Sequence, residues 1–251
     1  MQPRNNVYYN LGYWFLLLFL LSFVAFYNSY IGVIFQPSIP IIHIHFVLMA
    51  IWMVMLIVQP FLIKYKKRSL HKALGKASYV LVPLVLISGF LMIRFSHYRD
   101  IHQLQADAAR GANQYSDDQI LQIAAAYRAL PFIWFFWFII FYALAIVYRR
   151  KSSMHARFML ATGLALLGPI IDRLSFKMTS LINVFRLEAI AFLIADIVLG
   201  MLLLQDYRQK RSIYALRTAL IIYITGQILY FTVPDTAPWK HFVTFIMQPE
   251  A

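Results

Sequence analysis

Long runs of apolar residues alternate with short polar segments along the whole chain. Seven of these runs come near the roughly 20 residues that a helix needs to cross a lipid bilayer. They cover residues 13–35, 41–63, 74–93, 132–147, 158–171, 187–204 and 214–233. The fifth run is short, and its helix is expected to begin near Ser153 and to include His155 and Arg157. The pattern predicts an all-α polytopic membrane protein, a bundle of seven transmembrane helices that forms a single domain over residues 1–251.

The composition places most of this chain in lipid. Of its 251 residues, 61% are hydrophobic and 13% are charged, whereas soluble domains carry about 25% charged residues. The sequence contains no cysteine, which excludes disulfides and thiolate metal sites. The net charge of +13 is concentrated in the segments between the apolar runs. We therefore expect this charge to face membrane lipids and not nucleic acid.

The distribution of Lys and Arg predicts how the bundle is oriented. Fifteen of the 23 Lys and Arg residues lie in the N-terminal segment and around 64–77, 148–157 and 205–217, where Asp206 is the only acid. The other eight are spread over the remaining segments, together with eight acids. Cytoplasmic loops carry the excess of Lys and Arg in membrane proteins. We expect a protein of a bacterial-type plasma (inner) membrane, with the N-terminus in the cytoplasm and the C-terminus outside.

The longest connection, residues 94–130, is predicted to be an outer amphipathic loop. Ser116 and Gln119 have the spacing of a capping box, which marks the start of a helix. An apolar stripe at helical spacing follows them, formed by Ile120, Ile123, Ala124 and Tyr127. We expect a short helix lying on the outer surface, either as a connector that rests on lipid headgroups or as a lid over an outward-facing pocket.

Two histidines occupy matching positions at the cytoplasmic ends of two predicted helices. His71 and His155 each follow a basic cluster and a serine, Ser69 or Ser153, which is expected to be the N-cap. The helix dipole and the neighbouring Lys and Arg disfavour a charged imidazole there, and the neutral ring is the form that binds metal ions and haem iron. Alternatively, each histidine only binds lipid phosphate or caps a neighbouring helix. The repetition suggests a weak internal repeat, with helices two and three matching helices four and five.

A second group of polar residues lies on the outer side or within the membrane. His45 is near the start of the second run, and Asp196 lies midway along the sixth, where a charged side chain costs roughly 2.5–3.5 kcal/mol on insertion scales. These two are candidate ligands of a divalent metal, and Asp196 is also a candidate proton carrier. Alternatively, Asp196 forms an ion pair or hydrogen bond that only fixes helix packing. The other polar residues expected near this site are His43, Asp172, Arg173, Arg186 and Glu188.

Four segments resemble one family of membrane proteins. LHKALG and HARFMLATGLALLGPIIDRL, which contain His71 and His155, are similar to the LHxxLG and HxRxM histidine motifs of a family of uncharacterised bacterial multi-pass membrane proteins. HFVLMAIWMVMLIVQ and ADIVLGMLLLQDYRQKR resemble the second and sixth spans of that family. The resemblance covers roughly residues 40–215 and implies no particular activity. More distantly, histidines on antiparallel spans are similar to those of transmembrane b-type cytochromes.

Three functions are compatible with these residues. The first is a redox or electron-transfer protein that binds one haem b near the cytoplasmic face, with His71 and His155 as axial ligands. The third helix is not expected to serve a second haem, because His97 follows His71 by 26 residues, about 39 Å of helix, and the hydrocarbon core is only about 30 Å thick. The second function is an intramembrane metal-dependent enzyme or proton-coupled carrier with an outward-facing His/Asp/Arg site. The third is a cofactor-free membrane scaffold. The first two require a redox partner or a small substrate.

Overall fold

The computed structural model describes residues 8, 10–36, 38–175 and 187–248, and these residues form helices and connecting segments without any strand. A 3₁₀ turn, η2 (Ile31–Val33), joins the first two α-helices. The α-helices are α1 (Leu11–Phe26), α2 (Pro40–Lys64), α3 (Arg68–Ala109), α4 (Asp117–Ala126), α5 (Ala129–Val147), α6 (Ser152–Leu164), α7 (Leu167–Ser175), α8 (Leu187–Arg208), α9 (Tyr214–Thr232) and α10 (Ala237–Ile246). The predicted all-α class is confirmed for this part of the chain.

Six helical stretches of the described chain are long and apolar enough to cross a membrane. They are α2, α3, α4 continued by α5, α6 continued by α7, α8 and α9. The first predicted span corresponds to α1, which has 16 residues and extends about 24 Å, less than the roughly 30 Å of the hydrocarbon core. The prediction of a multi-pass, helical membrane protein is therefore confirmed. As expected, α6 begins close to Ser153 and includes His155 and Arg157.

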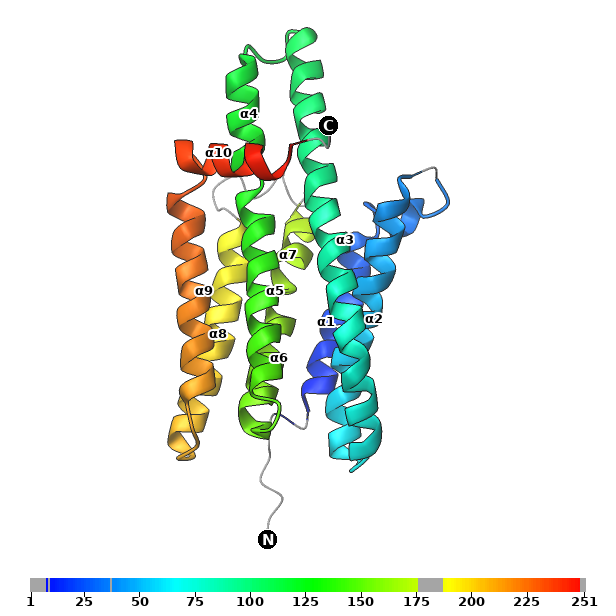
Figure 1. The fold of residues 1–251 in the computed structure, drawn as a ribbon, viewed down its shortest axis with the longest axis vertical. Coiled ribbons are helices and arrows are strands. Elements are labelled where there is room, and N and C mark those ends of the chain that lie inside the picture. The colour runs from blue at the N-terminus through cyan, green and yellow to red at the C-terminus, as the bar shows by residue number, and fades with distance from the viewer. Residues whose placement is uncertain (1–7, 9, 37, 176–186, 249–251) are drawn as a thin grey trace.

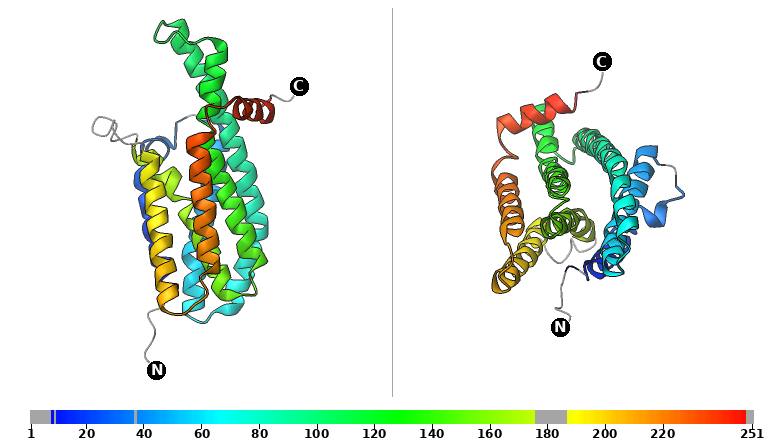
Figure 2. Two further views of the ribbon diagram at one scale, coloured as in Figure 1. Left: turned by 90° about the vertical axis from the view of Figure 1, so that its left-hand side faces the viewer. Right: turned by 60° about the horizontal axis from the view of Figure 1, so that its bottom comes forward.

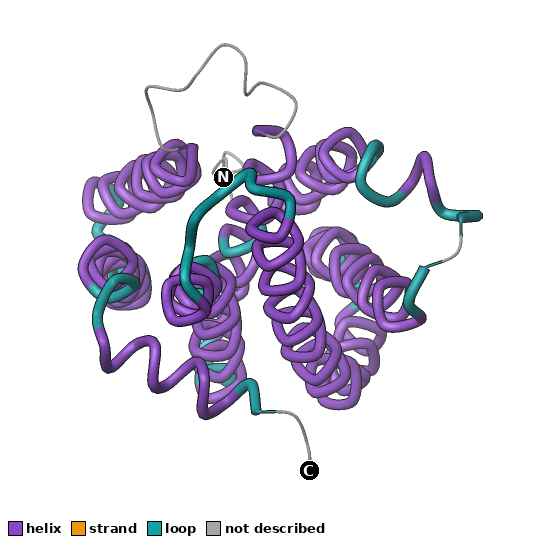
Figure 3. Tube along the Cα trace, turned by 90° about the horizontal axis from the view of Figure 1, so that it is seen from above, coloured by secondary structure: helices purple, strands orange, loops and turns teal. Residues whose placement is uncertain are grey.

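The long helices run side by side along one axis (Figure 1). Helices α1, α2 and α3 pack together on one side, and α5, α6, α8 and α9 form the other side (Figure 2). Contacts of α1 with α7 and of α3 with α5 join the two sides. Viewed from above, the helices surround a central region between the two sides (Figure 3). Any site at either end of this region is therefore built from both halves of the chain.

The basic connections all lie at one end of the bundle. Figure 1 shows the α2–α3, α5–α6 and α8–α9 connections at the lower end. Together with the adjoining helix ends, these connections contain 14 of the 20 Lys and Arg residues of the described chain. The connection after α3 and the helix α10 lie at the opposite end. The helix order thus separates charge along the bundle axis in the way that the sequence pattern predicts.

The outer end differs from the prediction for residues 94–130. Helix α3 does not end near residue 93 but continues to Ala109, so that its total length is 42 residues. Helix α4 stands beside this extension instead of lying flat (Figure 1). The capping box is confirmed, since Ser116 and Gln119 each accept a hydrogen bond from the backbone of the other. Ile120 and Ala124 of the apolar stripe are buried, and α4 contacts both α3 and α10. Tyr127, at the end of the stripe, is 55% exposed.

Helix α10 lies across this outer end and was not anticipated from the sequence (Figure 1). Its start carries a local signal, since the Thr236 side chain accepts from the N–H of Trp239 and Pro238 occupies the first turn. The indole of Trp239 donates to the carbonyl of Ala125 in α4 at 2.8 Å. Lys240 forms an ion pair with Asp118 of α4. These contacts join the α4 and α10 helices at this end of the bundle.

A close approach of α1 to α2 depends on Gly12. A Cβ atom at Gly12 would lie 2.8 Å from the carbonyl oxygen of Ile57 and 2.7 Å from the ring of Phe61. We expect Gly12→Ala to reduce the free energy of unfolding by about 1–3 kcal/mol, because α1 must move away from α2. Gly200→Ala in α8 is the matched control, since no atom lies within 4 Å of the added carbon. Thermal unfolding in detergent would measure both; an unaffected Gly12→Ala would contradict the close packing of α1.

Candidate functional site: a histidine-lined cavity

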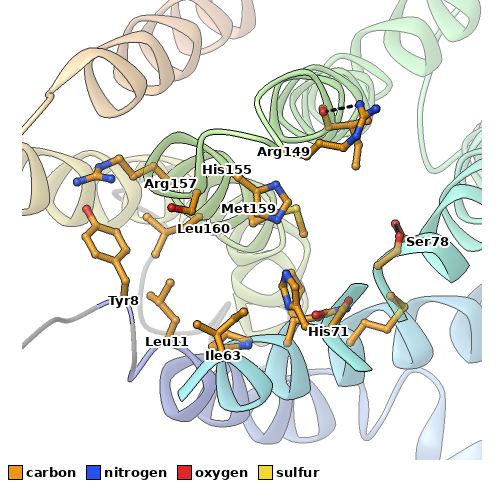
Figure 4. Close-up of a pocket in the computed structure, with 18 of the residues that line it drawn as sticks. Tyr8, Leu11, Ile63, His71, Ser78, Arg149, His155, Arg157, Met159 and Leu160 are labelled. Atoms are coloured by element: carbon orange, nitrogen blue, oxygen red, sulfur yellow. Dashed lines mark hydrogen bonds between the residues drawn. The ribbon is translucent and has the colours of Figure 1, made fainter. Parts of the chain in front are cut away.

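A cavity of about 870 Å³ lies between the two halves of the bundle at its basic end (Figure 4). This volume is at the upper end of the range for small-molecule and cofactor sites, roughly 300–1,000 Å³. Its apolar wall includes Leu11, Phe15, Trp52, Leu56, Met159 and Leu160. Its charged lining residues are Lys72, Lys76, Arg149, Arg150, Arg157 and Arg211, with no Asp or Glu among the described residues that line it. The cavity therefore suits a largely apolar molecule that also carries negative groups.

His71 and His155 face each other across this cavity (Figure 4). His71 comes from α3 and His155 from α6, and the centroids of their rings are 6.4 Å apart. The ring planes are nearly perpendicular, at 86°. The two helices belong to different halves of the bundle, so only tertiary packing brings the rings together. The structure thus places side by side the two histidines that the sequence pattern singled out.

The two helix starts are equivalent in detail, but they differ from the predicted caps. Helix α3 begins at Arg68 and α6 at Ser152, and neither start has a side-chain cap. Ser69 and Ser153 are therefore inside the helices and are not N-caps, so the prediction was wrong on this point. Each histidine is the fourth residue of its helix. The backbone N–H of His71 donates to the carbonyl oxygen of Lys67, and the backbone N–H of His155 donates to the carbonyl oxygen of Lys151, both at 3.0 Å.

The hydrogen bonds of the two rings determine which nitrogen faces the cavity. Nδ1 of His155 lies 2.8 Å from the carbonyl oxygen of Ala145 in α5. A carbonyl oxygen only accepts, so Nδ1 carries the proton and the lone pair is on Nε2. Nδ1 of His71 is enclosed without a partner, which leaves Nε2 as the nitrogen on the open side. Both rings thus present Nε2, the nitrogen with which a histidine binds a metal when its Nδ1–H is occupied.

A buried ion pair beside the cavity was missed by sequence reasoning. Arg157 donates from Nε to Asp206 at 2.7 Å, and the two side chains are only 4% and 1% exposed. Tyr8 donates to the same carboxylate at 2.9 Å and lies against the guanidinium. Burial raises the pKa of the Tyr8 hydroxyl, which keeps it protonated as a donor. The sequence did contain a sign of this ion pair, because Asp206 is the only acid in the basic segments.

This ion pair ties Tyr8, α6 and α8 together at the basic end of the bundle. Arg157 also donates from Nη1 to the carbonyl oxygen of Ser153 at 2.6 Å, in the first turn of α6. Because His155 lies between these two positions in the sequence, the ion pair holds the turn that carries the histidine. Arg157 and Asp206 are thus structural supports of the cavity wall, and Arg157 also lines the cavity itself.

The residues of the predicted outer site have separate partners. His45 in α2 contacts the Ser88 hydroxyl of α3 at 3.0 Å, whereas both carboxylate oxygens of Asp196 accept from Gln227 of α9 at 3.0 Å. His43 contacts Tyr30 at 2.8 Å and also Ser38. His45 and Asp196 therefore do not share a partner.

The remaining outer residues lie at the ends of two helices. Asp172 and Arg173 are in the last turns of α7, and Glu188 is in the first turn of α8. Arg186 is outside the described residues. Among the described residues, no group of three or more His, Asp or Glu side chains is arranged to hold a metal ion.

Comparison with protein families, with characterised proteins and with solved structures finds no match to this chain. The class that the fold and the cavity define is a multi-pass helical membrane protein with a histidine-lined cavity at its basic end. What the cavity binds must be inferred from its geometry and chemistry.

Proposed function

We propose that this protein is a membrane redox protein that binds one b-type haem in the cavity, with His71 and His155 as axial ligands. The observation that carries the proposal is the 6.4 Å separation of the ring centroids. An imidazole Nε2 lies about 2 Å from a bound metal and roughly 1 Å from its own ring centroid, so two rings on opposite sides of one iron have centroids about 6 Å apart. When bound, haem iron supplies one-electron transfer.

The other residues of the cavity fit the two kinds of surface that a haem presents. Its apolar wall, with Trp52 and Leu56 deep in the bundle, matches the hydrocarbon macrocycle. Its basic rim, with Lys76 and Arg150 near the cytoplasmic end, matches the two propionate groups. Neither Lys76 nor Arg150 has an ion-pair partner among the described residues. The rim can therefore accept two negative charges without breaking an existing ion pair.

The visible spectrum of the purified protein tests this proposal. We expect a Soret band in protein that is produced with a haem supply, and sharpening of the long-wavelength bands on reduction. A colourless protein that does not take up added haemin would contradict it. Zinc or iron without a Soret band would instead favour the metal-dependent enzyme or carrier, and a colourless, metal-free protein would favour the scaffold.

We also propose that α1 crosses the membrane as a seventh span, with the N-terminus in the cytoplasm and the C-terminus outside in a bacterial-type plasma membrane. Asn10, just before α1, accepts from Lys64 at the cytoplasmic end of α2. At the other end of α1, Phe26 lies against Arg173, near the outer end of α7. Helix α1 therefore extends from the basic end of the bundle toward the outer end of α7, and the bilayer would thin around its 16 residues.

The absence of cysteine allows a direct test of this orientation. We expect Asn28→Cys and Gln114→Cys to react with a membrane-impermeant maleimide in intact cells, because both lie in exposed connections at the outer end. Asn10→Cys and Gln209→Cys should react only after the membrane is opened. The measurement is gel detection of the labelled protein. Labelling of Asn10→Cys in intact cells would show that α1 does not cross.

A further inference from the structure

We infer that Gln59 is the positioning residue that sets the tautomer of His71, by accepting a hydrogen bond from its Nδ1–H. The inference rests on the proposed role of His71 as a haem ligand and names the group that keeps the lone pair of this ring directed into the cavity. Gln59 lies in α2, which precedes the histidine helix, and it lines the same cavity.

The two residues are already in contact. Nε2 of Gln59 donates to the backbone carbonyl of His71 at 3.3 Å. On the same two residues, the Gln59 Oε1 atom and the His71 Nδ1 atom are both enclosed without a hydrogen-bond partner. A buried acceptor or donor without a partner costs about 1–3 kcal/mol. One is an acceptor and the other can be a donor, so a hydrogen bond between them would give each atom the partner that it lacks.

The other half of the bundle contains the same arrangement in completed form. There the helix that precedes the histidine helix is α5, and its Ala145 carbonyl accepts from Nδ1 of His155 at 2.8 Å. In both halves, the acceptor therefore comes from the last turns of the preceding helix. The equivalence of the two helix starts, each with a histidine at the fourth position, extends to this neighbouring contact.

An acceptor at Nδ1 has two consequences for a ligand histidine. It places the proton on Nδ1, so that Nε2 offers a lone pair, and it makes that lone pair more basic. Without it, a neutral imidazole favours the proton on Nε2, and the nitrogen that faces the cavity cannot bind iron. A neutral amide such as that of Gln59 is sufficient to place the proton on Nδ1, but it raises the basicity of Nε2 only moderately.

Nitrogen-15 NMR of haem-free protein labelled at histidine tests the inference without the cofactor. In the wild type we expect the His71 ring to be the Nδ1–H tautomer, with an unprotonated Nε2. Gln59→Leu should move its signals toward the Nε2–H tautomer, whereas Gln205→Leu in α8, at a position that does not line the cavity, should not. Signals of His71 that are the same in Gln59→Leu and in the wild type would overturn the inference.

A second variant covers the case in which Gln59→Leu does not fold. Gln59→Glu has nearly the same shape and is a stronger acceptor, so the reduction potential of the haem-loaded protein should fall. Unchanged potential in Gln59→Glu would count against the inference. In the loaded protein, Gln59→Leu should weaken haem binding about 10- to 100-fold. If the wild type binds no haem, the proposed function fails, and the NMR result on the haem-free protein still decides the role of Gln59.

Discussion

Replacing His71 with alanine is expected to abolish haem binding and with it the Soret band. His71 lines the cavity with its Nε2 toward the open side, 6.4 Å from His155 between ring centroids. Changing a group that is hydrogen-bonded to a metal ligand typically lowers the metal affinity roughly 10- to 100-fold. Removing the ligand itself should lower the affinity further. We expect His155→Ala to have the same effect, because one iron needs both rings for six-coordinate binding. Titration with haemin measures both affinities.

The control for these variants lies on the same helix as His71. His102 is an exposed residue of the outer extension of α3, far from the cavity. His102→Ala should therefore retain the full Soret band and the wild-type affinity for haemin. A haem that binds both cavity variants as tightly as the wild type would show that His71 and His155 are not its ligands.

Asp206→Ala is expected to cause the largest loss of stability among single substitutions at the basic end of the bundle. The carboxylate is 1% exposed and is bonded by Arg157 and Tyr8. Removing one partner of a buried ion pair leaves an uncompensated charge and costs about 3–5 kcal/mol. Thermal unfolding in detergent, at one detergent concentration for all variants, measures the change.

An exposed ion pair at the other end of the molecule provides the comparison for Asp206. Asp107 pairs with Arg110 in the outer part of α3, where the Arg110 side chain is 71% exposed. Asp107→Ala should cost at most about 1 kcal/mol, because water screens such pairs. The double variant Arg157→Met with Asp206→Leu should regain most of the stability that Asp206→Ala loses. Equal, small effects of Asp206→Ala and Asp107→Ala would show that the buried pair does not support the fold.

The stability of this ion pair and the proposed binding of haem are expected to be linked through α6. Arg157 holds the first turn of α6 through Ser153 as well as pairing with Asp206. Loss of Asp206 therefore loosens the turn that carries His155. We expect Asp206→Ala to weaken haem binding too, but less than either histidine variant, because both ligands remain.

Much of the architecture was predictable because its physical cause is local. Each long apolar run must form a helix in lipid, where every backbone N–H and C=O has to be satisfied within the segment. The capping box of Ser116 and Gln119 is likewise decided by residues three apart, and it is found as predicted. The matched histidines of α3 and α6 were found by their spacing from the basic clusters alone.

Other features depend on packing between segments that are far apart in the sequence. The outer half of α3 has no apolar run after Ile93, and it is helical up to Ala109 beside α4 above the bundle. Helix α10 is placed by Trp239 and Lys240, whose partners are more than 100 residues away. The pairing of Arg157 with Asp206 likewise joins two helices that are far apart in the sequence.

The sequence by itself determined the membrane class, the basic end and the two histidine helix starts, since lipid and local hydrogen bonding act on each segment separately. Only the tertiary structure decided that the two rings face one cavity, that Gln59 adjoins His71, and that Asp196 pairs with Gln227 instead of His45. The physical reason is that distances between helices are set by how side chains pack across their interfaces, and no spacing along one chain encodes which faces will meet.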